Sequence, residues 1–223
     1  MYPAWDGLHH AAITGESGFN KVFGQPLFDY LGTHSDLAPF FDVGMTAIHG
    51  HETTTMLEAY HFSAIHLLAD IGGGNGSLIG AVLQCYPNLK GLLFDLSHVV
   101  VRARESLKAY GVDDRCSVVE GDFLKSVPGG ADTYLFRHII HDWTDEQSVQ
   151  ILNNCRKVIP NDGRLLIIEA VVPTGNGLLE AKQSFPNQVF CSEPLAPSLN
   201  NGQSNCVQFT PWIYQLEKLQ IVI

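Results

Sequence analysis

The stretch Leu68-Ala69-Asp70-Ile71-Gly72-Gly73-Gly74-Asn75-Gly76-Ser77 decides the fold. Apolar residues lead into an acid, and glycines follow at 72, 74 and 76. Glycines at a turn from strand to helix let the backbone come close to a ligand, and the next helix offers N–H groups at its N-terminus. The stretch therefore predicts a strand, a turn and a helix that together bind a nucleotide-like ligand.

The same alternation of strand and helix continues from this stretch along the chain. Apolar bursts at 66–71, 91–94, 117–120, 134–140 and 165–172 predict strands, and helical patterns begin at Gly76 and run from Ser97 to Tyr110. Regular alternation of this kind is typical of an α/β fold with a doubly wound, mostly parallel sheet.

The two ends of the chain have a different texture. Residues 1–66 are predicted to be helical: Ser35 and Asp36 are candidate caps, Pro39 falls in the first turn, and four apolar residues follow at helical spacing, namely Leu37, Phe41, Met45 and Ile48. Beyond Pro173 the chain is rich in Gly, Asn, Gln, Ser and Pro. We therefore expect a helical segment at 1–66, a ligand-binding domain at 67–173 and an irregular tail at 174–223.

Within this tail, residues 212–223 alternate weakly and could form a short helix or strand. They are the only candidate to pair with the fifth strand, at 164–169, which otherwise becomes an apolar edge. They could pair there only after a loop of about forty residues whose composition favours disorder, so we expect a marginal or self-associating protein with a mobile tail.

Composition excludes several classes of protein. The 223 residues carry a formal net charge of −10, which repels nucleic acid, and 45% hydrophobic residues supply a core. The five cysteines are odd in number and widely spaced, as isolated thiols are in a reducing compartment. No signal peptide or membrane-length apolar run is present, so a cytoplasmic protein without a membrane partner is expected.

Two carboxylates narrow the ligand class. The turn reads D-x-G-x-G-x-G and not the G-x-G-x-x-G of dinucleotide sites, and Asp70 would repel a pyrophosphate. An acid at this place suits a cation, such as the amino group of S-adenosylmethionine. Asp95 ends the second strand 25 positions later, where such domains hold the two ribose hydroxyls.

A third strand end completes the predicted ligand site. In Gly121-Asp122-Phe123, the carboxylate of Asp122 could accept from an exocyclic amine of adenine, and the ring of Phe123 offers a stacking face. Taken alone, this tripeptide is a weak signal.

The fourth and fifth strand ends carry a candidate acid–base pair. A hydroxyl on an aromatic ring ionises near ~10 and an imidazole near ~6.5, so a positioned histidine can take a proton from such a hydroxyl near pH 7. His141 follows the fourth strand and Glu169 closes the fifth. If the strand order is 3-2-1-4-5, both lie at the ligand-binding edge, with His141 as base and Glu169 orienting its imidazole. The alternative for His141 is a feature of the helix that starts at the capping box Thr144-x-x-Gln147.

A metal site is the rival interpretation of the histidines. His138-x-x-His141-Asp142, together with His49-Gly-His51-Glu52, has metal-binding residue types. A continuous strand would place His138 and His141 on opposite faces, so we expect no metal site.

Five motifs occur in order: Asp-Ile-Gly-Gly-Gly-Asn-Gly, Phe-Asp-Leu-Ser-His-Val-Val, Glu-Gly-Asp-Phe, His-Ile-Ile-His-Asp-Trp-Thr-Asp-Glu-Gln and Leu-Ile-Ile-Glu-Ala-Val-Val-Pro. Over residues 4–173 the chain resembles the small-molecule O-methyltransferases of the caffeate and hydroxyindole type. The resemblance implies a class I methyltransferase (Rossmann-like) fold and transfer of a methyl group from S-adenosylmethionine to a hydroxyl of a small aromatic acceptor. It assigns the catalytic base to His141 and the cofactor to seven residues: Asp70, Gly72, Gly74, Asp95, Asp122, Phe123 and Arg137.

The chain also departs from that family. Relatives carry a helical dimerisation domain before the region of Trp5, so the family's homodimer interface is expected to be mostly absent. Residues 174–223 match none of the helices, acceptor-pocket residues and strands with which relatives continue. The alternative hypothesis is a truncated, catalytically impaired protein that binds S-adenosylmethionine.

Overall fold

The computed structural model describes residues 2–169 and 221–222, and the chain divides into two compact units, residues 1–49 and 50–223. The predicted irregular tail, and the end of the fifth apolar burst beyond Glu169, lie outside the described residues apart from 221–222. The predicted domain boundaries after residues 66 and 173 stay predictions.

The first unit is helical, as the sequence predicted. It contains the 3-10 helix η1 and the helices α1 to α3, and α4 continues from it into the second unit: η1 Tyr2–Gly7, α1 Leu8–Thr14, α2 Gly18–Phe23, α3 Leu27–Thr33 and α4 Ala38–Ala59. Aromatic rings pack α2 against α3, with the centroids of Phe23 and Tyr30 4.8 Å apart. The expected apolar face of α4 fails at Ile48, whose side chain is 66% exposed.

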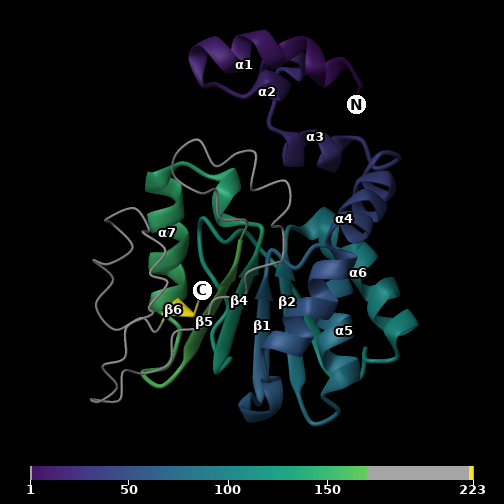
Figure 1. Ribbon diagram of the computed structural model, residues 1–223, viewed down its shortest axis with the longest axis vertical. Helices are drawn as coiled ribbons and strands as arrows, with labels where there is room; N and C mark the ends of the chain where they lie inside the picture. Colours follow the sequence, from purple (N-terminus) through teal and green to yellow (C-terminus); the bar gives the residue numbers. More distant parts are fainter. Residues whose placement is uncertain (1, 170–220, 223) are drawn as a thin grey trace. The chain divides into compact units, whose positions relative to one another are not determined.

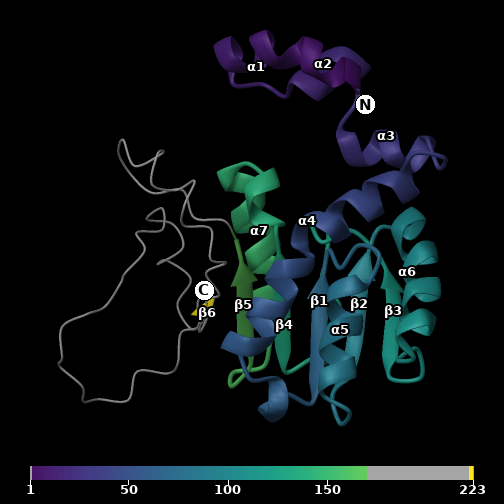
Figure 2. The ribbon, with the colours of Figure 1, turned by 45° about the vertical axis from the view of Figure 1, so that its right-hand side comes forward.

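The second unit alternates strands and helices (Figures 1 and 2). Its elements after α4 are η2 Phe62–Ala64, β1 Leu67–Ile71, α5 Ser77–Cys85, β2 Lys90–Asp95, α6 Ser97–Tyr110, β3 Cys116–Glu120, β4 Thr133–Arg137, η3 Ile140–Asp142, α7 Asp145–Arg156, β5 Arg164–Ile168 and β6 Ile221–Val222. The capping box predicted at Thr144 and Gln147 is present at the start of α7.

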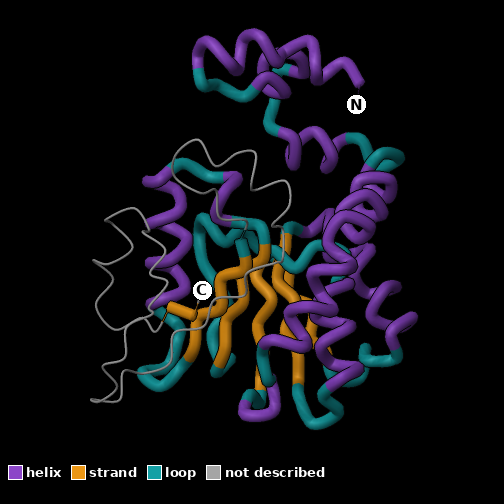
Figure 3. Tube along the Cα trace, viewed as in Figure 1, coloured by secondary structure: helices purple, strands orange, loops and turns teal. Residues whose placement is uncertain are grey.

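The strands form one parallel sheet in the order β3-β2-β1-β4-β5-β6 (Figure 3). This order confirms the predicted doubly wound α/β fold, and it changes direction between β1 and β4. The short strand β6 pairs with β5 in parallel, Ile221 opposite Leu165 and Val222 opposite Leu166, which is the pairing considered for the end of the chain.

Alternating side chains of the strands feed two hydrophobic cores on opposite faces of the sheet. Leu68, Leu93 and Leu135 belong to a cluster that also contains buried residues of α5 and α6. Ala69 and Phe94 belong to a second cluster, which contains the buried residues of α7. Both faces are covered because side chains alternate along a strand and parallel crossovers place helices on both sides.

One predicted strand is too long. The apolar burst 134–140 suggested a strand up to Ile140, but β4 ends at Arg137. The next residue, His138, has φ 54°, a left-handed conformation that cannot continue a strand. Its N–H still donates to the carbonyl of Ile168 at 2.9 Å, so the chain turns while it remains attached to β5.

Two further expectations from the sequence concern the cysteines and membrane-spanning helices. Cys85, Cys116 and Cys155 are free thiols within the described part of the chain. Among the described residues, no helix combines the length and the apolar character that crossing a bilayer requires.

Candidate active site

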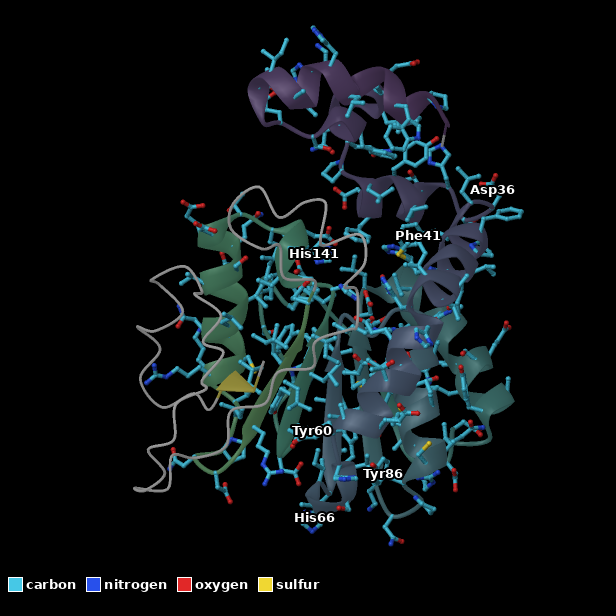
Figure 4. The ribbon with its side chains drawn as sticks, viewed as in Figure 1. Asp36, Phe41, Tyr60, His66, Tyr86 and His141 are labelled. Carbon is cyan, nitrogen blue, oxygen red and sulfur yellow. The ribbon has the colours of Figure 1, made fainter. Side chains whose placement is uncertain are left out.

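The candidate residues gather at the edge of the sheet where the parallel strands end. Figure 4 shows His141 at this edge and His66, which directly precedes β1, at the opposite edge. In doubly wound sheets, ligands bind at the carboxyl ends of the strands beside the point where strand order reverses.

The glycine turn follows β1 and its amides are already in use. Gly72 N–H donates to the carbonyl of Phe94 at 2.8 Å, and Gly74 N–H donates to Asp95 Oδ2 at 2.8 Å. At the start of α5, Ser77 N–H donates to Asn75 Oδ1 at 3.1 Å. The expectation that the helix start offers free N–H groups is therefore wrong at Ser77, because the turn consumes that amide internally. A phosphate would need such donors, and a cationic ligand does not.

Gly72 also determines what lies against the turn. Its φ is +72°, and a Cβ built there would lie 2.4 Å from Ile139 Cδ1 and 3.5 Å from a ring carbon of Phe123. Only glycine satisfies both conditions. The loop after β4 therefore packs directly onto the turn after β1, which brings the two halves of the predicted site together.

Asp70 is buried in β1 and 2% exposed. The N–H of Ile79 in α5 donates a hydrogen bond to its carboxyl group, while Oδ2 has no hydrogen-bond partner. Burial raises the pKa of this carboxyl to about 7, although the nearby positive charge of Arg137 lowers it. An incompletely satisfied buried acid fits a cationic group, as the sequence suggested.

Asp95 ends β2 beside the turn. Its Oδ2 accepts from Gly74 N–H at 2.8 Å and its Oδ1 accepts from Leu96 N–H at 2.7 Å. Burial raises the pKa of Asp95, and these two backbone hydrogen bonds lower it. A carboxylate has about four acceptor positions, so this one still has capacity for two hydroxyls.

Asp122 and Phe123 lie in the loop after β3. Asp122 Oδ1 accepts from Leu124 N–H at 2.9 Å and its Oδ2 lies 3.2 Å from Lys125 Nζ, so this carboxylate already stabilises its own turn. The ring of Phe123 lies edge-on to Trp143, with centroids 5.4 Å apart. Phe123 therefore lies between the glycine turn and the segment after η3.

Arg137 is tied to α4. Its Nη1 donates to Thr53 Oγ1 at 2.8 Å. Burial lowers the pKa of Arg137, and the negative charges of Asp70 and Glu52 counter only part of that effect. Its observed contact is thus with the protein, and the predicted role toward a cofactor stays a prediction.

His141 and Glu169 meet as the sequence predicted. His141 Nδ1 lies 2.5 Å from Glu169 Oε2, and Glu169 Oε1 accepts from the N–H of Ile140 at 2.9 Å. The His141 side chain is 50% exposed and that of Glu169 is 14% exposed, so the imidazole can meet a ligand while its partner is held inside. The hydrogen bond that His141 Nδ1–H donates to Glu169 raises the pKa of His141.

Glu169 is held ionised by two imidazoles. Burial alone would raise its pKa, but contacts with His138 and His141 lower it to about 2. A permanent carboxylate keeps the proton of His141 on Nδ1, which leaves Nε2 to accept a proton from a substrate.

Sequence reasoning missed the role of His138. The argument that His138 and His141 lie on opposite faces of a strand is wrong because the strand ends at Arg137, and their ring centroids are 5.6 Å apart. His138 Nε2 lies 2.8 Å from Glu52 Oε2, and its Nδ1 lies 3.7 Å from Glu169 Oε2. The signal was present as two histidine-rich motifs, His49-Gly-His51-Glu52 and His138-x-x-His141.

We expected no metal site because a continuous strand would separate His138 from His141. The end of β4 at Arg137 removes that reason. Donor atoms of His138, His141 and Glu169 all lie within 4.8 Å of one another. The absence of a metal stays a prediction.

Comparison with known proteins identifies the family. Residues 5–189 match the sequence profile of a family described as an O-methyltransferase domain. The chain is 40% identical over 175 residues to phenazine O-methyltransferase PhzM of Lysobacter antibioticus, covering 78% of this chain and 51% of that protein. It is 36% identical over 178 residues to caffeic acid 3-O-methyltransferase of Medicago sativa, covering 78% and 46%.

Solved structures agree with the fold. An O-methyltransferase from neocarzinostatin biosynthesis, NcsB1, in complex with S-adenosylmethionine and 2-hydroxy-5-methyl naphthoic acid, matches with a TM-score of 0.73 and 30% identity, covering 78% of this chain and 54% of that one. The mitomycin 7-O-methyltransferase MmcR matches with a TM-score of 0.75 and 35% identity, covering 82% and 54%. The chain spans about half the length of the curated relatives it matches. The resemblance inferred from the five motifs is confirmed: this chain belongs to the O-methyltransferase domain family.

Proposed function

We propose that this chain carries the cofactor-binding and proton-transfer parts of an S-adenosylmethionine-dependent O-methyltransferase that acts on a hydroxyl of a small aromatic acceptor. The observation that carries the proposal is the packing of Ile139 onto Gly72, which holds the loop of His141 against the glycine turn. A methyl donor and a base must be neighbours for this reaction, and here the elements that would hold them touch.

The residues of the turn fit the cofactor. The buried Oδ2 of Asp70 lacks a partner and would favour the amino group, while Asp95 retains acceptor capacity for the ribose hydroxyls. Asp122 and Phe123 would face the adenine, and Gly72 and Gly74 keep side chains away from the ligand. When bound, S-adenosylmethionine supplies a methyl group on a positively charged sulfur.

His141 would act as the general base. Its Nε2 would take the proton of the acceptor hydroxyl, which leaves the oxygen able to receive the methyl group that S-adenosylmethionine would supply. Glu169 holds Nδ1–H and stabilises the imidazolium that results. Asp142 Oδ1, 3.4 Å from Nε2, adds a second negative charge beside it.

The acceptor class rests on the relatives. Their names describe methyl transfer to phenazine and caffeic acid, and NcsB1 was solved with a hydroxylated naphthoic acid. We extend to this chain only the shared chemistry, a hydroxyl on a small aromatic ring. A cytoplasmic location remains part of the proposal.

The proposal is tested by incubating the chain with methyl-labelled S-adenosylmethionine and a panel of hydroxylated aromatics: a hydroxyphenazine, caffeic acid and a hydroxynaphthoic acid. Label should pass to at least one acceptor in the wild type, and His141→Gln should lower the rate of transfer by about 10²–10⁴. Binding of S-adenosylhomocysteine without transfer to any acceptor would favour the alternative of a catalytically impaired binding protein.

A further inference from the structure

A second imidazole stands behind the proposed base. His138 lies between two carboxylates: its Nε2 is 2.9 and 2.8 Å from the two oxygens of Glu52, and its Nδ1 is 3.7 Å from Glu169 Oε2. Glu52 is 7% exposed and the His138 side chain is 16% exposed. The pair is therefore mostly inside the protein, and the more exposed imidazole of His141 lies on its outer side.

The backbone is arranged to place His138 there. Its φ of 54° is rare for a residue other than glycine, and such a conformation persists only where the surroundings enforce it. Two neighbouring residues of α4 contact two neighbouring residues at the end of β4. Glu52 contacts His138, and Thr53 Oγ1 accepts a hydrogen bond from Arg137. The helix thus fixes the start of the loop that carries the base.

The charges around the two imidazoles decide their protonation. Glu52 and Glu169 face His138, Arg137 lies near Glu52, and Asp142 faces His141. His49 is three residues before Glu52 on α4. Because a carboxylate faces each of its nitrogens, His138 is satisfied only when both carry protons, that is, as an imidazolium.

Direction of titration supports this assignment. Burial lowers the pKa of His138, but its contacts with Glu169 and Glu52 raise it to about 9. The positive charge of His138 in turn lowers the pKa of His141 and so opposes the effect of Glu169.

We propose that His138, held by Glu52, is a positioning residue for methyl transfer: its imidazolium faces Glu169 and opposes part of the effect of that carboxylate on His141, which makes the base easier to deprotonate. This inference rests on the proposed function. Glu169 alone would orient the base but would also keep it protonated, and the buried pair separates these two effects.

The charge argument makes one prediction for each of the two partners. His138→Asn removes the positive charge, and Asn tolerates the left-handed backbone better than other side chains. The titration of His141 should then move to higher pH, because the charge of His138 lowers its pKa. Glu52→Gln removes a carboxylate that raises the pKa of His138, so it should move the titration of His141 in the same direction and by less. The double variant should shift it no further than His138→Asn alone, and Glu58→Gln on the exposed surface of α4 is the matched control.

The experiment is an NMR pH titration of the full chain with labelled histidine side chains, in which His141→Gln assigns the His141 signal. Circular dichroism checks that each variant is folded. The acidic limb of the pH profile of kcat/KM should move with the titration, which a merely structural role would not produce.

The imidazole titration decides the inference because it needs no turnover. An unchanged His141 titration in folded His138→Asn, or a downward shift in Glu52→Gln, overturns it. If the wild type methylates none of the acceptors, that result counts against the proposed function and not against this inference.

Discussion

The two halves of the sheet edge solve different problems. At the ends of β1 and β2, the carboxylates of Asp70 and Asp95 contact only backbone N–H groups in the described hydrogen bonds, and one buried oxygen has no partner. At the ends of β4 and β5, side-chain charges already satisfy one another, from Glu52 through His138 and Glu169 to His141. The first half, the ligand half, retains capacity for a ligand. The second half carries the proposed base and is called the proton-transfer half below.

The independence of the two halves is tested most directly by a substitution of the proposed base. His141→Ala should lower the rate of methyl transfer by about 10²–10⁴, since the base acts only on the acceptor. Affinity for S-adenosylhomocysteine, measured by calorimetry, should stay within about twofold of the wild type. Loss of cofactor binding in this variant would show that the two halves are not separable.

The junction between the halves is tested at Gly72. Gly72→Ala adds a Cβ at positive φ that collides with Ile139, whereas Gly111→Ala adds one at φ +68° with nothing within 4 Å. Both variants should lose about 1–2 kcal/mol of unfolding free energy from the backbone conformation. Only Gly72→Ala should also impair methyl transfer, because it displaces the loop of the base. Equal activity in the two variants would contradict the described junction.

At the ligand half we expect the affinity for the cofactor to depend on pH. The pKa of Asp70 is raised to about 7 by burial, and a bound cation would lower it again. Affinity for S-adenosylhomocysteine should therefore be full above pH 7 and fall by up to about tenfold for each pH unit below it. Asp70→Asn should remove this dependence. A wild-type affinity that does not change between pH 5.5 and about 8 would argue against contact between Asp70 and a cation.

At the proton-transfer half we expect a smaller effect, a dependence of folding stability on pH. His138 has its pKa raised from 6.5 to about 9, so its contribution is complete below pH 6.5 and is lost as pH rises through 9. Glu169 has its pKa lowered from 4.5 to about 2, so its contribution is complete above pH 4.5 and is lost as pH falls through 2.

Thermal unfolding checks this window. The melting temperature of the wild type should exceed that of His138→Asn most between pH 4.5 and 6.5, and the difference should shrink toward pH 9. A difference that is constant over this range would mean that His138 contributes packing and not charge.

What the sequence could predict follows the same division. Asp70, the glycines and Asp95 could be named as candidates because the first half of the edge is local: strand, turn and acid are adjacent in the chain. Glu52 and His138 were missed because their contact joins residues 86 positions apart. It also depends on one residue with positive φ, which an apolar burst conceals. The pairing of His141 with Glu169 was predictable because parallel strand ends meet at one edge.

Calorimetric titration with S-adenosylhomocysteine tests the central claim most directly, using two carboxylates that both accept backbone N–H groups. Asp95 caps the turn at the ligand edge, whereas Asp132 accepts from His66 and Leu67 N–H at the opposite edge. Asp95→Ala should weaken binding by about 10- to 100-fold through loss of charge-assisted contacts, and Asp132→Ala should leave it unchanged. Equal affinity in the two variants would show that the cofactor does not bind at the ends of β1 and β2.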